Sequence, residues 1–266
     1  MKKARLASLF AALSATLAVF GAPGIQAARA DALDDILKAG VIKVAVPQDF
    51  APFGSAGSDM KPQGYDIDMA ALVAKALSVK VEIIAVTSAN RIPYLQTRKA
   101  DIVISSLGKN AEREKVIDFT AAYAPFFSGV FGAKSVTVAG AADLASKTIG
   151  ATRGSVEEQE LTKLAPASAT IKRYEDNNAT IAAFISGQVD LIATGNVVAA
   201  AIAEKSPARA PISKFVIQNS PCFIGLNKGE EKLQARLNEI IAKAKTSGEL
   251  EALSNKWLKA PLPEGF

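Results

Sequence analysis

Arg113 is the residue whose type and position most directly suggest chemistry. It stands between Glu112 and Glu114, shortly after a stretch at 101–105 that has the apolar composition of a buried strand. Open α/β sheets bind ligands at the carboxyl ends of their strands, and a planar guanidinium can grip a carboxylate through two parallel hydrogen bonds. The position therefore favours the binding of a small anion. The alternative is a surface arginine that pairs with Glu112 or Glu114.

Ser155 marks a second position that suits an anion. The run 152–157 reads as the end of a strand, a glycine turn and the start of a helix over 155–164. Free N–H groups and the positive end of such a helix favour a carboxylate. A simple N-cap would select the same serine, and the two roles are compatible.

The composition narrows the remaining chemistry. The chain contains no histidine and one cysteine, Cys222, so it lacks the commonest general base and zinc ligand and cannot form an internal disulfide. No Gly-rich phosphate loop, Ser-x-x-Lys signature or Cys/His metal spacing occurs. Asp66 and Asp68 lack a third ligand at calcium-loop spacing, and Asp66 is expected to be the N-cap of a helix over 66–77. We therefore expect no metal, no cofactor and no enzymatic activity.

Residues 1–30 have the pattern of a secretory signal peptide. Basic residues precede an uncharged apolar run at 6–20, and Ala28-Arg29-Ala30 provides a small-x-small cleavage site. The run of about 15 residues is shorter than the roughly 20 that cross a bilayer, which disfavours the alternative of a retained anchor. No cysteine follows the cleavage site, which argues against a lipid anchor. The pattern predicts export to the periplasm.

The charge of the mature chain excludes one class of partner. Four of the 31 basic residues lie within residues 1–30, so the mature chain has 27 basic and 26 acidic residues and a net charge of +1. Nucleic-acid binding requires a basic patch that releases counterions. We therefore expect no nucleic-acid partner.

Short apolar strands alternate with amphipathic helices along the whole chain, which predicts an α/β fold with mainly parallel sheets. The expected strands are 41–46, 81–86, 101–105, 128–131, 148–152, 170–174, 189–194 and 215–217. The expected helices are 66–77, 155–164, 177–186, 196–205, 230–247 and 250–258.

The length of the mature chain predicts two lobes. Roughly 236 residues exceed what one hydrophobic core usually organises. Proline-containing segments at 125–129 and 219–222 are the candidate crossings between the lobes. The prediction places lobe 1 at 31–127 plus 222–266 and lobe 2 at 128–221.

Five blocks of sequence together resemble one protein family. They lie at 33–40, 49–53, 64–70, 100–107 and 112–119. In this order and spacing they resemble the polar amino-acid binding proteins of bacterial ABC importers, the solute-binding proteins of family 3. The resemblance implies a two-lobed periplasmic binding protein of type II, with a sheet flanked by helices in each lobe. It also implies a ligand in the cleft and closure about two hinge crossings.

The resemblance also implies which residues bind the ligand. In similar proteins the arginine at the position of Arg113 holds the ligand's α-carboxylate beside the loop at 105–108, and Ser155 contacts it from the second lobe. Phe50 matches an aromatic residue that covers the aliphatic part of the ligand, although a core phenylalanine would look the same. The complete expected set is Phe50, Ser88, Arg91, Ser105, Ser106, Gly108, Arg113, Ser155, Asn177 and Asn196.

The run 87–96 most resembles the glutamate/aspartate-binding branch of the family. In that branch the arginine matching Arg91 pairs with the ligand's side-chain carboxylate, but another of its arginines has no counterpart near 47–48. A larger departure is Gly195, because amino-acid binders carry an aspartate there that neutralises the ligand's α-ammonium. Either Glu157 or another acid replaces this aspartate, or the ligand has no α-amino group.

The resemblance leaves two other functions open. Periplasmic cyclohexadienyl dehydratases resemble these binders and carry an acid in the cleft, but that position falls on Val198, which leaves Glu157 as the candidate acid. A soluble sensor that presents its ligand to a receptor is the third class. The leading hypothesis is a monomeric binding protein whose partners are a small amino acid or carboxylate and an inner-membrane ABC permease.

Overall fold

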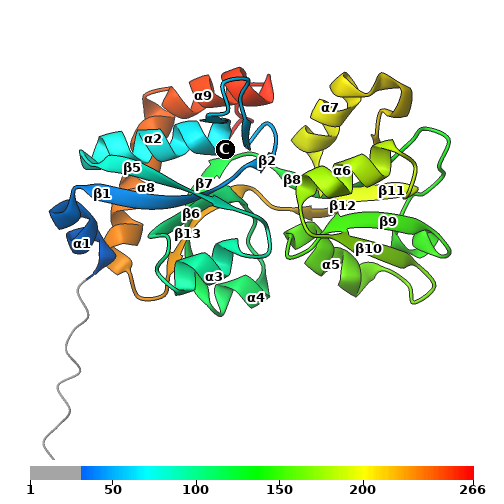
Figure 1. The fold of residues 1–266 in the computed structure, drawn as a ribbon, viewed down its shortest axis with the longest axis horizontal. Helices are drawn as coiled ribbons and strands as arrows, with labels where there is room; N and C mark the ends of the chain where they lie inside the picture. Colours follow the sequence, from blue (N-terminus) through cyan, green and yellow to red (C-terminus); the bar gives the residue numbers. More distant parts are fainter. Residues whose placement is uncertain (1–30) are drawn as a thin grey trace, which may run out of the picture.

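The structure, a computed structural model, describes residues 31–266. These residues form two bodies that lie side by side, each built on a five-stranded sheet with helices packed against it (Figure 1). The predicted α/β class is confirmed. The predicted signal peptide at 1–30 lies outside the described residues. Within 31–266, no helix has both the length and the apolar composition of a membrane span.

The first sheet has the strand order β5-β1-β6-β13-β7. Strands β5, β1 and β6 are parallel, whereas β13 is antiparallel to both β6 and β7, so the sheet is mixed. Its strands are β1 (Val41–Pro47), β5 (Lys80–Val86), β6 (Ile102–Leu107), β7 (Ile117–Ala124) and β13 (Cys222–Asn227). Its helices are α1 (Ala32–Ala39), α2 (Tyr65–Leu77), α3 (Arg91–Gln96), α4 (Ala111–Glu114), α8 (Glu231–Thr246) and α9 (Glu249–Leu253), followed by a π-helical turn at Ser254–Leu258.

The second sheet has the order β10-β9-β11-β8-β12. Strands β10, β9 and β11 are parallel, and β8 is antiparallel to both β11 and β12. Its strands are β8 (Phe127–Gly132), β9 (Thr148–Thr152), β10 (Thr170–Tyr174), β11 (Leu191–Gly195) and β12 (Ile212–Asn219). Its helices are α5 (Val156–Leu164), α6 (Asn177–Ile185) and α7 (Asn196–Lys205), with short 3-10 turns at Ala141–Leu144 and Pro207–Arg209.

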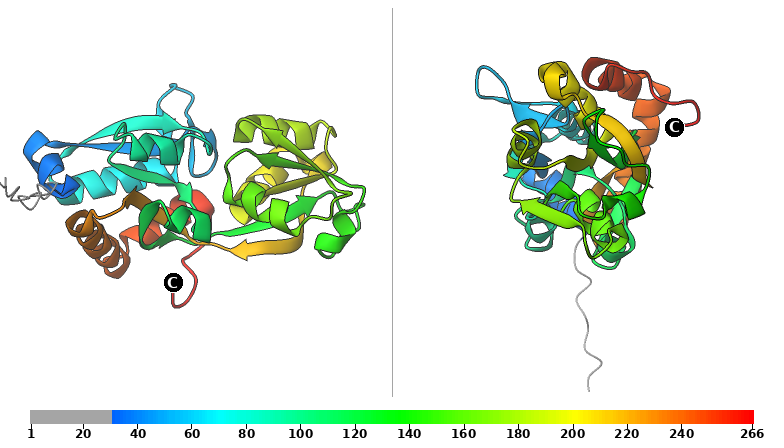
Figure 2. Two further views of the ribbon diagram at one scale, coloured as in Figure 1. Left: turned by 90° about the horizontal axis from the view of Figure 1, so that it is seen from below. Right: turned by 90° about the vertical axis from the view of Figure 1, so that its right-hand side faces the viewer.

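We call each sheet with its helices the first half and the second half of the protein. A small sheet of β2 (Asp49–Phe50), β3 (Gly54–Ala56) and β4 (Pro62–Gln63) extends from the first half. The chain passes between the halves twice, from β7 to β8 and from β12 to β13 (Figure 2). The first crossing is shorter than the predicted 125–129, because β8 already begins at Phe127. Where the two crossings meet, Ser220 N–H donates to the carbonyl oxygen of Phe126 at 3.3 Å.

The central strands are buried on both faces, as parallel strands covered by helices require. Along β1, Val44 and Val46 belong to one apolar cluster with α2 and α8, whereas Ala45 belongs to another with Leu95 of α3. The alternation of side chains along a strand produces this division. The parallel direction of β5, β1 and β6 brings their carboxyl ends to one edge of the sheet, and that edge faces the second half.

Candidate functional site

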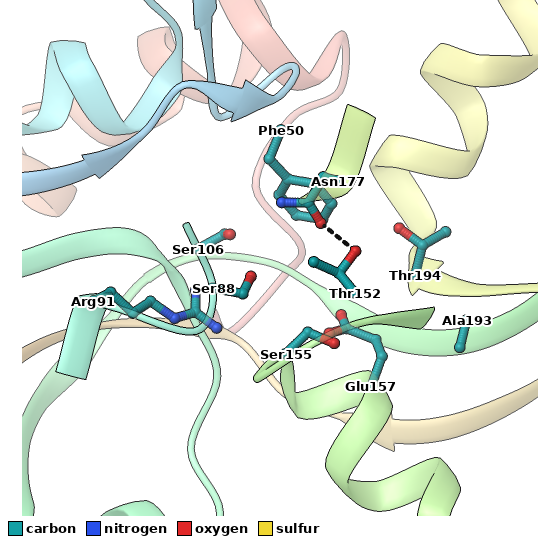
Figure 3. Close-up of a pocket in the computed structure, with 10 residues that line it drawn as sticks. All are labelled: Phe50, Ser88, Arg91, Ser106, Thr152, Ser155, Glu157, Asn177, Ala193 and Thr194. Atoms are coloured by element: carbon teal, nitrogen blue, oxygen red, sulfur yellow. Dashed lines mark hydrogen bonds between the residues drawn. The ribbon is translucent and has the colours of Figure 1, made fainter. Parts of the chain in front are cut away.

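A pocket lies between the two halves, at the carboxyl ends of strands from both sheets (Figure 3). Ligands of open α/β sheets bind at such edges. The pocket is narrow in this arrangement of the halves, because only about 10 Å³ of room for a water-sized molecule remains among the lining side chains. The lining residues are Phe50, Ser88, Arg91 and Ser106 from the first half and Thr152, Ser155, Glu157, Asn177, Ala193 and Thr194 from the second.

Arg91 brings a buried positive charge to the pocket. It is the first residue of α3, and only 4% of it is exposed. One guanidinium nitrogen donates to the carbonyl oxygen of Ser105, while Nε has no hydrogen-bond partner among the described residues. Burial lowers the pKa of Arg91, and the negative charge of Glu157 partly opposes this.

Arg113 is also buried, but its hydrogen bonds join the halves. Its two terminal nitrogens donate to the carbonyl oxygens of Gly108, at 2.7 Å, and Gly154 of the second half, at 2.9 Å. Burial and then the nearby charge of Arg91 lower the pKa of Arg113 to about 9, so the side chain is still protonated at neutral pH. Asn110, the N-cap of α4, accepts from the N–H of Arg113 at 3.0 Å and holds it in place.

The two guanidinium groups leave positive charge uncompensated by ion pairs. The ion pairs of residues 31–266 include neither Arg91 nor Arg113. Leaving a charge buried without a partner costs several kcal/mol. An anionic group that enters beside Arg91 would therefore gain charge-assisted hydrogen bonds at a site that is already desolvated.

The prediction that Asp66 is the N-cap of a helix is wrong. Helix α2 begins at Tyr65 with Gly64 as its N-cap, so Asp66 lies inside the first turn and is not the N-cap. Its buried carboxylate accepts from Ser106 N–H at 2.7 Å and from Tyr123 Oη at 2.6 Å. These bonds hold Ser106, whose φ of 41° is left-handed, at the edge of the pocket. Burial raises the pKa of Asp66 to about 7, against the opposing effect of the two hydrogen bonds.

Ser155 is the N-cap of α5, as one of the two compatible roles predicted. Its Oγ accepts from Glu158 N–H at 3.0 Å, and its side chain lines the pocket. The positive end of this nine-residue helix therefore faces the pocket from the second half. The arrangement favours negative charge on the ligand near Ser155.

Asn177 lines the pocket and joins the two halves. Its backbone N–H and its Nδ2 both donate to Asp49 Oδ2, at 2.7 Å and 3.1 Å. Its Oδ1 accepts from Thr152 Oγ1 at 2.9 Å. Much of its hydrogen-bonding capacity is thus used within the protein, and its main partner is Asp49.

Asn196 and Gly195 lie where the second half meets the crossings. Asn196 Oδ1 accepts from the N–H of Phe127 at 3.1 Å and so fixes the start of β8. A Cβ atom on Gly195 would lie 2.0 Å from Cζ of Phe126. The ring of Phe126 therefore occupies the space that an aspartate side chain at 195 would need, which explains the departure at this position.

Glu157 supplies a buried carboxylate to the pocket. It lies in the first turn of α5, is 6% exposed, and accepts from Ser128 Oγ at 3.1 Å. It is the acid predicted from the sequence as one replacement for the aspartate missing at 195. Figure 3 shows its carboxylate near Ser155, facing the pocket.

The structure brings part of the predicted site together around the pocket. Phe50, Ser88, Arg91, Ser106, Ser155 and Asn177 line it. The other four predicted residues lie beside the pocket, and the hydrogen bonds described for them are made with other groups of the protein: Ser105, Gly108, Arg113 and Asn196. Their contact with a ligand stays a prediction. Thr152 and Thr194 were missed, although both stand at the ends of predicted strands that could have indicated them. No set of three or more acidic or cysteine side chains within 31–266 is placed to hold a metal.

The sequence matches a known family over most of its length. The family is described as bacterial extracellular solute-binding proteins, family 3, and the match spans residues 42–260. An L-cystine-binding protein of Escherichia coli (strain K12) is 26% identical over 232 residues, which cover 86% of this chain and 86% of that protein. A glutamate/aspartate import solute-binding protein of the same strain is 28% identical over 277 residues, with 99% and 90% covered.

A solved structure supports the same relationship. A cysteine-binding protein from Campylobacter jejuni superposes with a TM-score of 0.81 at 26% identity, covering 89% of this chain and 96% of that one. The fold is thus the two-lobed α/β fold of the amino-acid binding proteins, as the resemblance implied. Because the match extends from β1 to beyond the last helix, the chain belongs to the bacterial extracellular solute-binding proteins of family 3.

Proposed function

We propose that this protein is the substrate-binding component of an ABC importer that captures an amino acid, with glutamate or aspartate favoured, or another small carboxylate. The ligand binds in the pocket between the halves and is delivered to an inner-membrane permease. The protein works as a monomer in the periplasm and carries out no catalysis. The observation that carries the proposal is the buried positive charge of Arg91 and Arg113, which lacks an ion-pair partner among the described residues.

The geometry suits a carboxylate held from both halves. Arg91 reaches the pocket from α3, and Ser106 lies at the end of β6. From the other side, the N-terminal end of α5 at Ser155 adds a positive dipole. A ligand that contacts both halves stabilises the closed arrangement, because only that arrangement makes both sets of contacts.

The relatives support an amino-acid ligand and leave its side chain open. One relative imports glutamate and aspartate by its name, and another binds L-cystine. Arg91 favours a ligand with an acidic side chain, because the second carboxylate of such a ligand could pair with the guanidinium of Arg91 in addition to that of Arg113.

A ligand screen tests the proposal. The melting temperature of the mature chain, beginning at Asp31, is measured with each of the common L-amino acids and with small dicarboxylates. The affinity of each ligand that raises the melting temperature is then measured by calorimetry. A ligand that binds only the folded state raises the melting temperature by mass action. We expect carboxylate-bearing amino acids to raise it and the corresponding amines without a carboxylate to leave it unchanged. If no carboxylate binds, the proposal fails.

An enzymatic role of the cyclohexadienyl dehydratase type is the second candidate. Val198, at the position of the dehydratases' acid, is 1% exposed and belongs to the hydrophobic core, so it supplies no proton. The placement of Glu157 in the pocket is the one observation that favours this candidate. Loss of a cyclohexadienyl carboxylate on incubation with the protein would support it, and binding without turnover would support the transport role.

A further inference from the structure

Glu157 is the one carboxylate among the residues that line the pocket. Its Oε1 accepts a hydrogen bond from Ser128, which lies on β8 and is completely buried. This hydrogen bond orients the carboxylate of Glu157. No ion pair of residues 31–266 includes it, and its charge acts on Arg91 and Arg113 without direct contact.

The other acids near the pocket do not line it. Asp66 accepts from Ser106 and Tyr123, and Asp49 Oδ2 accepts twice from Asn177, whereas Asp49 Oδ1 is buried away from the pocket lining without a partner among the described residues. At the end of β11, the ring of Phe126 blocks any side chain at 195. These observations leave Glu157 as the acceptor that a cationic group on the ligand can reach.

Opposite charges thus face the pocket from opposite halves. Figure 3 shows the Arg91 guanidinium extending into the pocket from the first half and the Glu157 carboxylate lying across from it in the second. The two do not form an ion pair in the structure. A ligand with a negative group at one end and a positive group at the other would satisfy both buried charges together, whereas a simple anion would satisfy only the first.

We propose that Glu157 accepts the ammonium group of the ligand while Arg91 holds a carboxylate, so that the pocket selects zwitterionic amino acids over the same acids without an amino group. This inference rests on the proposed function and names the chemistry by which the same pocket selects its ligand. Selection follows because a hydrogen-bonded charge pair forms with the amino acid, whereas the deaminated acid leaves the Glu157 carboxylate desolvated beside a second anion.

Calorimetry with matched ligand pairs tests the inference. Each amino acid that binds in the screen is compared with the same acid lacking its amino group, for example L-glutamate with glutarate and L-aspartate with succinate. We expect the wild-type protein to prefer the amino acid by about tenfold or more. Glu157→Gln should lose most of this preference, chiefly by weaker binding of the amino acid, and Glu157→Asp should restore part of it.

Glu158→Gln is the matched control, because Glu158 is the next residue of α5 and pairs with Arg173 outside the pocket. It should keep the preference of the wild type. Circular dichroism establishes that each variant is folded. A preference that survives in Glu157→Gln, or a wild type that binds both members of each pair equally, overturns the inference while leaving carboxylate capture intact. A wild type that binds no carboxylate overturns the proposed function itself.

Discussion

Asp49 of the first half accepts two hydrogen bonds from Asn177 of the second, at 2.7 Å from its backbone N–H and 3.1 Å from its side-chain amide. A second link joins Arg113 to the carbonyl oxygen of Gly154 at 2.9 Å. The protein therefore holds its two halves together through its own groups as well as through any ligand. Hinge closure in such proteins depends on the balance between these contacts and the solvation of the open cleft.

Removal of the Asp49 link should shift the protein toward an open arrangement. Asp49→Ala deletes both hydrogen bonds to Asn177, and bonds to a charged group are worth about 1.5 to 3 kcal/mol. We expect a larger radius of gyration in small-angle scattering of the ligand-free protein and an affinity about tenfold weaker. Asp59→Ala, at an exposed carboxylate paired with Lys61, is the control. An unchanged radius and affinity would show that the link does not govern closure.

Loss of Arg113 should weaken binding whether it contacts the ligand or joins the halves. Arg113→Ala removes the bonds to Gly108 and Gly154 along with a buried charge. We expect the binding free energy to fall by about 3 to 5 kcal/mol in calorimetry. Arg153→Ala, at a half-exposed arginine, should have little effect. Wild-type affinity in Arg113→Ala would contradict the role of this residue.

Arg91 should determine the response to a second carboxylate. Arg91→Gln removes one of the two buried guanidinium charges. A dicarboxylic ligand that uses both should therefore lose more affinity than a monocarboxylic ligand that can still use Arg113. Calorimetry on an acidic and a neutral amino acid from the screen measures the difference. Arg236→Gln, on the outer surface of α8, is the matched control. Equal losses for both kinds of ligand would eliminate the acidic side-chain hypothesis.

Asp66 should make stability depend on pH. Its folded pKa of about 7 is far above the usual value near 4. Between these values the folded state keeps a proton that the unfolded state has released, so the contribution of Asp66 to the free energy of unfolding declines as the pH rises. Asp66→Asn cannot ionise and should lack this decline. Urea unfolding at pH 5 and pH 8 should show the variant less stable at pH 5, with the deficit shrinking or reversing at pH 8; a constant difference would refute the shift.

Position 195 should require glycine because of the nearby Phe126 ring and not because of its backbone conformation. Its φ of −81° is open to any residue, but an added Cβ would collide with the Phe126 ring. Gly195→Ala should therefore reduce the free energy of unfolding by about 1 to 3 kcal/mol. The double variant with Phe126→Ala should be more stable than the sum of the single effects predicts. Strictly additive effects in denaturant unfolding would show that the two residues do not compete for the same space.

Local patterns predicted much of the second half. The strands at 148–152 and 170–174 and the helix at 196–205 have the predicted bounds. Strands β7 and β13 were missed, because their partners lie far away in the sequence and their own alternation is weak. Helix α3 was missed as well, since its six residues include Pro93 and show no full helical period.

The sequence by itself determined the α/β class and the family, because these depend on short motifs and on the alternation of strands and helices. Six of the residues that it indicated as ligand-binding line the pocket, and their contact with a ligand stays a prediction. Only the tertiary structure decided that Asp66 supports Ser106 across 40 positions, that Asp49 binds Asn177 across 128, and that Phe126 fills the space beside Gly195. Such contacts join distant parts of the chain whose pairing leaves no local pattern. The packing of the two sheets and the crossings between them creates these contacts, and no single segment contains them.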